Sequence, residues 1–388
     1  MRLPPRILFV TESFGVGGTE NHLLDLLPEL KGRGFEVAAF CFTVKGSRAS
    51  LLEKIGITVH AAPTLGQSKR SVLAPARMIG GAAKLFTLIK RFRPSIVHFY
   101  LPGPYLAGAP VAIASRVPIK LMSRRSMADY QTKWPGAAAT ERLMHTRMDA
   151  LLGNARAVTD ELLREGCPEA KVHLIYNGVR QPDAHMNRAE ARKVLGLDAE
   201  TFVATTVANL LPYKGHLDLV AALAEIADRI PQPWLVLCAG REGGSRAGIE
   251  QAIAQSGLGQ NIRLLGERSD VPLLLAASDL GILAPTRNEG FSNSVLESMA
   301  AGLPMVVTKV GGNAEAVLHG ETGLVVPPHN PSALGAAILT LAQDPPRRRA
   351  MGERARLRAT QEFSLAASVD KYCALYEDLL ARANLATQ

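Results

Sequence analysis

The chain has 388 residues, of which 47% are hydrophobic and 20% charged, so a packed core is expected and a disordered chain is excluded. This length exceeds what one hydrophobic core usually organises, and two domains are therefore expected. Four cysteines without a Cys-x-x-Cys pair exclude a disulfide framework and a cysteine zinc site.

The net charge of +9 is unevenly distributed. Residues 1–185 hold 25 Lys and Arg against 14 Asp and Glu, whereas the rest of the chain is close to neutral. Between Lys54 and Ala128 there are twelve basic residues and no acidic one. Such a stretch is typical of a surface that meets nucleic acid, a phosphate-bearing substrate or an anionic membrane, and it also fits a merely solvated basic face.

No targeting or spanning segment is expected. The apolar run at 7–10 is too short for a signal peptide, and no run reaches the roughly 18 apolar residues of a spanning helix. We therefore expect a cytoplasmic protein, at most peripheral on the inner face of a membrane.

Short apolar and β-branched runs alternate with helix-period segments along the whole chain. In the first half, strands are predicted at 7–10, 37–42, 57–59, 96–99, 119–122, 150–152 and 172–176. In the second half, strands are predicted at 202–208, 234–239, 262–265, 280–283, 305–308 and 324–326. Near-continuous apolar strands separated by helices indicate parallel sheets covered on both faces. The predicted fold class is α/β, with two doubly wound Rossmann-like domains facing each other across a cleft.

The domain limits follow from the polar, unpatterned segment at 178–187. We predict an N-terminal domain at 1–180 and a C-terminal domain at 188–365. A helix at about 366–388 is expected to pack back on the N-terminal domain. Because ligands of open α/β sheets bind beyond the carboxyl ends of the strands, polar residues directly after strands are the candidates for a site.

Three features follow strands in the first half. Gly17 and Gly18 lie between the first strand and a helix, where glycines let a ligand approach backbone N–H groups; a plain tight turn is the alternative. This is not a dinucleotide fingerprint, because Glu20 stands where the third glycine is needed. His98 ends a strand and could be either a core residue or a ligand. Arg124 and Arg125 follow the next strand and suit a phosphate or carboxylate, unless they are a surface pair.

The second half is more specific. Asn209 and Lys214 follow a strand, and Lys214 lies just before a predicted helix, where a lysine beside helix N–H groups suits a diphosphate. Glu289 precedes another helix and Glu297 lies inside it, so both carboxylates could accept hydrogen bonds from sugar hydroxyls. Backbone groups of 290–292 could contact phosphate or sugar oxygens at the start of that helix.

These motifs together resemble the retaining GT-B glycosyltransferases of family 4. The resemblance extends over nearly the full length and is carried most specifically by the stretch from Glu289 to Pro304, with seven residues between Glu289 and Glu297. The early Gly-Gly-Thr-Glu, Pro-Tyr-Lys-Gly-His, Ile-Tyr-Asn-Gly-Val before the linker, Gly311-Gly312 and Gly-Glu-Thr-Gly-Leu occur in the expected order.

The resemblance implies that a sugar moves from a nucleoside-diphosphate sugar to an acceptor hydroxyl. A UDP-sugar is the commonest donor, and a GDP-sugar is the alternative. By position, Glu297 would bind the ribose, and Lys214 would neutralise the leaving diphosphate. The transferred sugar or its phosphate would lie near Glu289, Gly290, Phe291 and Ser292. His98 would face the sugar from the N-terminal, acceptor-side domain, and Gly17 and Gly18 would admit acceptor and diphosphate. Asn209 stands where relatives often carry Arg, so Lys214 must share its task with helix N–H groups.

The resemblance also implies an enzyme with no cofactor and no metal, since no Asp-x-Asp motif occurs. The expected partners are the donor and a sugar or lipid-linked anionic acceptor of cell-envelope, glycolipid or polysaccharide synthesis, with Arg124 and Arg125 as candidate phosphate contacts. A sugar-nucleotide epimerase or hydrolase on the same architecture is the alternative enzyme. A basic binding protein is a weaker alternative, and nucleic acid is not expected because aromatic residues are sparse in the acid-free stretch.

Overall fold

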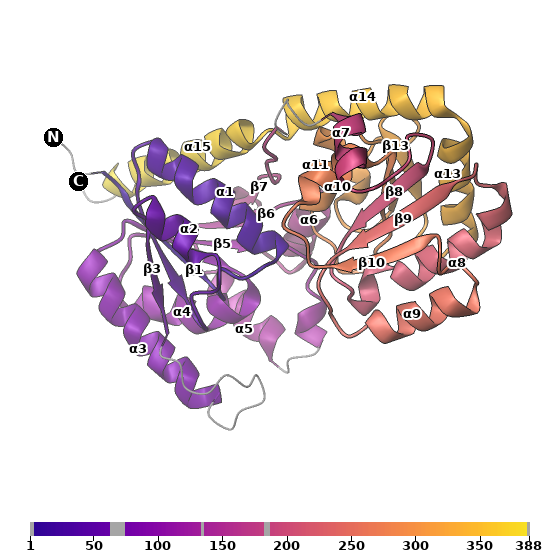
Figure 1. Cartoon of the computed structure of the whole chain (residues 1–388). Coiled ribbons are helices and arrows are strands. Elements are labelled where there is room, and N and C mark those ends of the chain that lie inside the picture. The colour runs from indigo at the N-terminus through magenta and orange to yellow at the C-terminus, as the bar shows by residue number, and fades with distance from the viewer. Residues whose placement is uncertain (1–3, 63–73, 133–135, 182–186, 386–388) are drawn as a thin grey trace. The chain divides into compact units, whose positions relative to one another are not determined.

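The computed structural model describes residues 4–62, 74–132, 136–181 and 187–385. They belong to two compact units (Figure 1). The N-terminal unit consists of Met1–Asn177 and Leu365–Gln388, and the C-terminal unit of Gly178–Ser364. Residues 182–186 of the predicted linker, and Lys69 and Arg70 of the acid-free stretch, lie outside the described residues.

The N-terminal unit is built on a seven-stranded parallel sheet with the order β3-β2-β1-β4-β5-β6-β7. Its strands are β1 (Arg6–Thr11), β2 (Glu36–Cys41), β3 (Thr58–Ala61), β4 (Ile96–Tyr100), β5 (Ile119–Arg124), β6 (Ala150–Gly153) and β7 (Val172–Leu174). Neighbouring strands are in simple register, with Phe9 beside His98 and His98 beside Leu121. From β1 the chain adds β2 and β3 on one side, and it then places β4 to β7 on the other side of β1. The direction of strand addition therefore reverses between β1 and β4, and this is the switch point of the sheet.

Helices cover both faces of this sheet (Figure 1). They are α1 (Gly18–Gly32), α2 (Ala49–Lys54), α3 (Ala74–Phe92), α4 (Pro102–Ala114), η1 (Asp129–Thr132), α5 (Ala137–His145), α6 (Arg156–Arg164), η2 (Glu169–Lys171) and α15 (Leu365–Leu385). Alternation along β1 sends Ile7 and Phe9 to the face covered by α1 and α15, and Leu8 and Val10 to the face covered by α3 and α4. Two buried apolar layers result, one on each side of the sheet.

The C-terminal unit repeats this plan with six parallel strands in the order β10-β9-β8-β11-β12-β13. The strands are β8 (Phe202–Val207), β9 (Trp234–Ala239), β10 (Ile262–Gly266), β11 (Leu280–Leu283), β12 (Met305–Thr308) and β13 (Gly323–Val326). The helices are α7 (Arg188–Val194), η3 (Pro212–Lys214), α8 (His216–Ile226), η4 (Ala227–Arg229), α9 (Arg246–Gln255), α10 (Val271–Ala277), α11 (Asn293–Ala300), α12 (Asn313–Ala316), α13 (Pro331–Gln343) and α14 (Pro345–Glu362). The switch point here lies between β8 and β11.

The α/β class and the two Rossmann-like sheets predicted from the sequence are confirmed. Each predicted strand corresponds to an observed strand, with ends that differ by at most two residues. In the part of the chain that the structure describes, no helix is long and apolar enough to cross a membrane.

Candidate functional site

The switch point of the C-terminal sheet brings together loops that are far apart in sequence. The chain after β8 carries Asn209 and Lys214, and the chain after its neighbour β11 carries Glu289. Carboxyl ends of adjacent parallel strands lie at the same edge of a sheet. Residues separated by 75 positions therefore meet.

Gly215 fixes the position of Lys214. Its φ of 74° is in the left-handed region that favours glycine, and a Cβ there would lie 1.7 Å from the carbonyl oxygen of Ala284, just after β11. The backbone N–H of Thr286 donates to the carbonyl of Tyr213 at 2.8 Å, which ties the two loops together. Lys214 thus ends a short 3-10 turn that is packed on the start of the β11–α11 loop.

The Lys214 Nζ donates to Oε2 of Glu289 at 2.7 Å. Both side chains are largely enclosed, with 17% and 11% of their surfaces exposed. Burial disfavours the charged ammonium, but attraction and the hydrogen bond from Glu289 outweigh it, so the pKa of Lys214 is raised. The site therefore holds a fixed, fully protonated ammonium at the sheet edge.

The backbone of Glu289 is supported by the loop after β12. Gly311 has a φ of 53°, and a Cβ on it would lie 2.0 Å from the Glu289 carbonyl oxygen. The N–H of Gly312 donates to the Gly290 carbonyl at 2.7 Å. Asn288, directly before Glu289, has a φ of 57°, a conformation that is uncommon outside glycine and concentrates at functional sites.

Helix α11 starts beside Glu289. Ser292 is its N-cap in an extended conformation, without a side-chain cap hydrogen bond, and its Oγ lies 3.1 Å from the Oγ of Ser294. Phe291 is 3% exposed and its ring packs edge-on against Phe363 at 5.1 Å, so this residue can offer a ligand only its backbone. Glu297 is half-buried in the second turn of the helix.

Asn209 joins the two loops that follow β8 and β9. Its Oδ1 accepts the backbone N–H of Arg241 at 3.3 Å, and the N–H of Leu210 donates to the carbonyl of Arg241 at 2.9 Å. The side-chain oxygen of Asn209 therefore has an internal partner. Asn209 therefore ties the loop that carries Lys214 to the loop after β9.

In the N-terminal unit, Gly17 and Gly18 lie at the start of α1, as the sequence predicts. Gly17 is the N-cap, without a side-chain cap, and a Cβ on it would lie 2.3 Å from Oε2 of Glu20. The loop is fastened by Arg48, whose Nε donates to the Gly15 carbonyl at 2.8 Å and whose Nη1 donates to Oδ1 of Asn21 at 2.7 Å. Sequence reasoning missed Arg48, because nothing at that position marks a contact with a loop 33 residues earlier.

The predicted role of His98 at the donor sugar stays a prediction, and the structure places its side chain in the core, which is the alternative that the sequence left open. It is fully buried, with Nδ1 2.7 Å from the Tyr376 hydroxyl and Nε2 2.8 Å from Oγ of Ser123. Burial, with a smaller contribution from Arg125, lowers the pKa of His98 to about 3. A neutral imidazole with both nitrogens engaged fastens α15 to β4 and β5.

Arg124 also differs from the prediction, because the protein itself supplies its anions. Its guanidinium bonds Glu165 at 2.6 and 2.9 Å and Glu141 at 3.0 Å, and only 3% of its side chain is exposed. Glu141, His145 and Glu165 place three possible metal-ligand atoms within 4.8 Å of one another. The cation that these carboxylates hold is Arg124, so this cluster is a buried ion network that joins β5, α5 and α6.

Arg125 directly follows β5 and faces Tyr100 and Tyr372, on the side of the sheet opposite to the Arg124 network. Its Cζ lies 5.9 Å from the centre of the Tyr100 ring, and its side chain is half-buried. The structure therefore separates the two adjacent arginines. Lys214 and Glu289 form one group in the C-terminal unit, and Gly17 and Arg125 belong to the switch-point edge of the N-terminal unit.

Two family models match the chain, one in each half. The model of Glycosyltransferase Family 4 matches residues 16–181, and that of Glycosyl transferases group 1 matches residues 187–358. The chain therefore belongs to the family 4, group 1 glycosyltransferases, which have the GT-B fold.

Similar proteins span nearly the whole chain. The D-inositol 3-phosphate glycosyltransferase of Corynebacterium diphtheriae is 26% identical, covering 93% of this chain and 90% of the relative. The lipopolysaccharide core biosynthesis mannosyltransferase LpsB of Rhizobium meliloti is 31% identical over 50% of this chain and 56% of its own. The crystal structure of Anabaena HepE with UDP-glucose has a TM-score of 0.83 at 24% identity, covering 96% of this chain and 99% of that one.

Proposed function

We propose that the protein transfers a sugar from a UDP-sugar to an acceptor hydroxyl with retention at the anomeric carbon, without a metal ion. The main support for a donor-binding site is the ion pair between Lys214 and Glu289, which is largely enclosed and lies at the switch point of the C-terminal sheet. The choice of uridine is supported by Anabaena HepE, whose structures contain UDP and UDP-glucose.

The chemistry follows from the charges that develop. Breaking the bond between the anomeric carbon and the phosphate oxygen leaves negative charge on the diphosphate and positive charge on the sugar. An ammonium has three N–H donors, so Lys214 can keep its bond to Glu289 and donate to a phosphate oxygen as well. The first N–H groups of α11 add positive potential, and preorganised donors of this kind stabilise the leaving group.

Retention follows if the acceptor attacks from the side of the leaving diphosphate. The acceptor oxygen forms the new bond to the anomeric carbon as the old bond breaks, and the hydroxyl proton passes to the leaving phosphate oxygen. Glu289 then stays paired with Lys214 and orients the sugar hydroxyls, while Glu297 binds the ribose. No protein carboxylate is consumed as nucleophile, unlike in retaining hydrolases.

The test combines donor binding with turnover. UDP is expected to stabilise the protein against heating, whereas NAD is not. Lys214→Ala and Glu297→Ala are each expected to reduce transfer by about 100-fold or more, because charge stabilisation and positioning each contribute on that scale. Activity in the presence of EDTA tests the metal-free step. Near-normal turnover of both variants, or donor isomerisation without an acceptor, would refute the assignment, the latter in favour of an epimerase.

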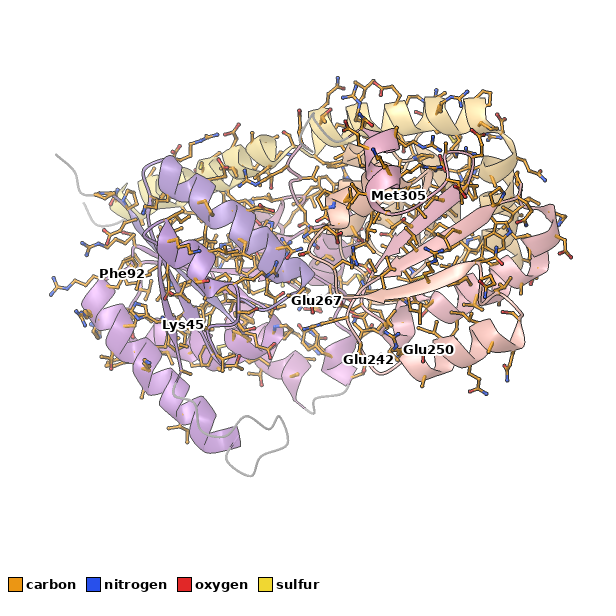
Figure 2. All side chains as sticks on the ribbon, in the orientation of Figure 1. Lys45, Phe92, Glu242, Glu250, Glu267 and Met305 are labelled. Atoms are coloured by element: carbon orange, nitrogen blue, oxygen red, sulfur yellow. The ribbon has the colours of Figure 1, made fainter. Side chains whose placement is uncertain are left out.

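We further propose that the enzyme works at an anionic membrane surface in envelope polysaccharide or glycolipid synthesis. Ile79 and Phe86 lie two turns apart on α3 and are 71% and 44% exposed. Lys90 lies beside them, with its Nζ 5.5 Å from the Phe86 ring, and Lys84 is also exposed. The same helix ends at Phe92 (Figure 2). Apolar side chains flanked by cations are typical of an interfacial helix.

Sedimentation with vesicles tests this surface. Binding to vesicles of phosphatidylcholine with phosphatidylglycerol is expected to weaken with salt, and Ile79→Ser with Phe86→Ser is expected to weaken it further. Leu357→Ser, at another exposed apolar residue, is the control. Salt-independent binding, or equal binding of all variants, contradicts the proposal.

A further inference from the structure

Arg125 lies at the switch-point edge of the N-terminal sheet. Arg125 directly follows β5, and the register places Tyr100 beside Ser123 of that strand. Its contacts with Tyr100 and Tyr372 put Arg125 on the face covered by α1 and α15. The carboxyl ends of β1, β4 and β5 therefore form this part of the sheet, next to the start of α1.

The guanidinium of Arg125 lacks a carboxylate partner. In the described part of the chain no ion pair joins Arg125 to an acidic side chain, in contrast to the neighbouring Arg124. Its Nε is buried without a hydrogen-bond partner, and its contacts are the Tyr100 ring and a hydrogen bond with Tyr372. Burial lowers the pKa of Arg125, whereas Tyr372, Tyr100 and Glu20 oppose this shift. Charges that are taken out of water are usually paired, so the partly buried Arg125, with its buried Nε–H, is an exception that an anion would satisfy.

Two further features mark the same edge. Thr11, the last residue of β1, has a fully buried Oγ1 without a hydrogen-bond partner and lies on the same face as Phe9. Leu101, directly after β4, has a φ of 69°, which is a strained conformation for a leucine. Unsatisfied polar atoms and backbone strain persist where function maintains them.

We infer that Arg125 binds a phosphate group carried by the acceptor, so that the enzyme acts on a phosphorylated acceptor. This rests on the proposed transferase function. A guanidinium offers planar, paired N–H donors to phosphate oxygens, and Arg125 has an Nε–H that no group in the described protein accepts. Arg124 plays no part in this binding, since both of its Nη groups are bonded to Glu141 and Glu165 and only 3% of its side chain is exposed.

The experiment uses the full chain saturated with UDP, so that the donor site is blocked, and measures thermal stability with glucose 6-phosphate, glucose, glucuronate or inorganic phosphate. Glucose 6-phosphate and inorganic phosphate are expected to raise the melting temperature, whereas glucose is not. Arg125→Gln is expected to weaken this binding by about tenfold or more, the usual scale for a charge-assisted contact. UDP affinity should stay unchanged in this variant.

Matched variants separate charge from packing. Tyr372→Phe removes the hydrogen bond of Arg125 but keeps its charge, and should retain phosphate binding. Lys54→Gln removes one exposed charge from the same unit and should also retain it. Equal phosphate binding by Arg125→Gln and the wild type, or no binding of either phosphate probe, would overturn the inference. Stabilisation by glucuronate to the same extent would overturn the phosphate assignment. Failure of UDP to bind the wild type would instead refute the proposed function.

Discussion

Gly311 stands where the loop after β12 passes against the backbone of Glu289. A methyl group there would lie 2.0 Å from the Glu289 carbonyl oxygen and 2.9 Å from that of Gly290. Gly311→Ala must therefore push Glu289 away from Lys214. A displacement of about 1 Å at a site can reduce turnover by about 100-fold, and we expect a loss of this order in initial-rate measurements with a UDP-sugar.

Gly320 provides the matched control for this substitution. It also has a positive φ, 82°, but a Cβ on it would meet no atom within 4 Å. Gly320→Ala should therefore cost only the backbone strain, about 1–2 kcal/mol of unfolding free energy, with normal turnover. Equal activity loss in both variants would show that strain, and not the position of Glu289, controls the rate.

At this scale the sequence predicts some residues better than others. Lys214 and Glu289 could be placed together because each follows a strand and the strands are neighbours in a doubly wound sheet. The sequence could not show that the side-chain oxygen of Asn209 accepts a hydrogen bond from the backbone N–H of Arg241, because this bond depends on how the two loops pair. The sequence left open whether His98 is a core residue or a ligand, because its partners, Tyr376 and Ser123, come from elements that spacing does not reveal.

Among the elements, strands are the most predictable because both faces of each sheet are covered. A strand buried on two sides must be apolar throughout, as β9 and β12 are, and its ends then stand out in the sequence. Strand β5 shows the limit of this reasoning. Arg124 and Arg125 look alike in sequence, and only the positions of Glu141 in α5 and Glu165 directly after α6 show which arginine is already paired.

At the scale of the whole molecule, one of the two units is continuous in sequence and the other is not. The C-terminal unit is one continuous segment, Gly178–Ser364, whereas the N-terminal unit needs Leu365–Gln388 to complete it. Helix α15 covers one face of the N-terminal sheet with buried Val369, Tyr372 and Tyr376, which pack with α1 and β1 (Figure 1). The helix is amphipathic in sequence, so its existence is predictable, but its partner face is set by the tertiary fold.

This division predicts different fates for the two units when the chain is ended after Ser364. Large apolar side chains such as Val369 each contribute about 1.5–3 kcal/mol on burial, and a whole domain is stable by only about 5–15 kcal/mol. Without α15, the N-terminal unit should therefore lose its cooperative unfolding transition and bind a hydrophobic dye. Residues 178–364 expressed alone should fold and bind UDP, because Lys214, Glu289 and Glu297 and their supports all lie within them. Circular dichroism melts, dye fluorescence and UDP titration measure these outcomes. A chain of residues 1–364 with an intact N-terminal transition would show that α15 adds little stability, and loss of UDP binding by a folded 178–364 segment would show that the donor site needs residues of the N-terminal unit.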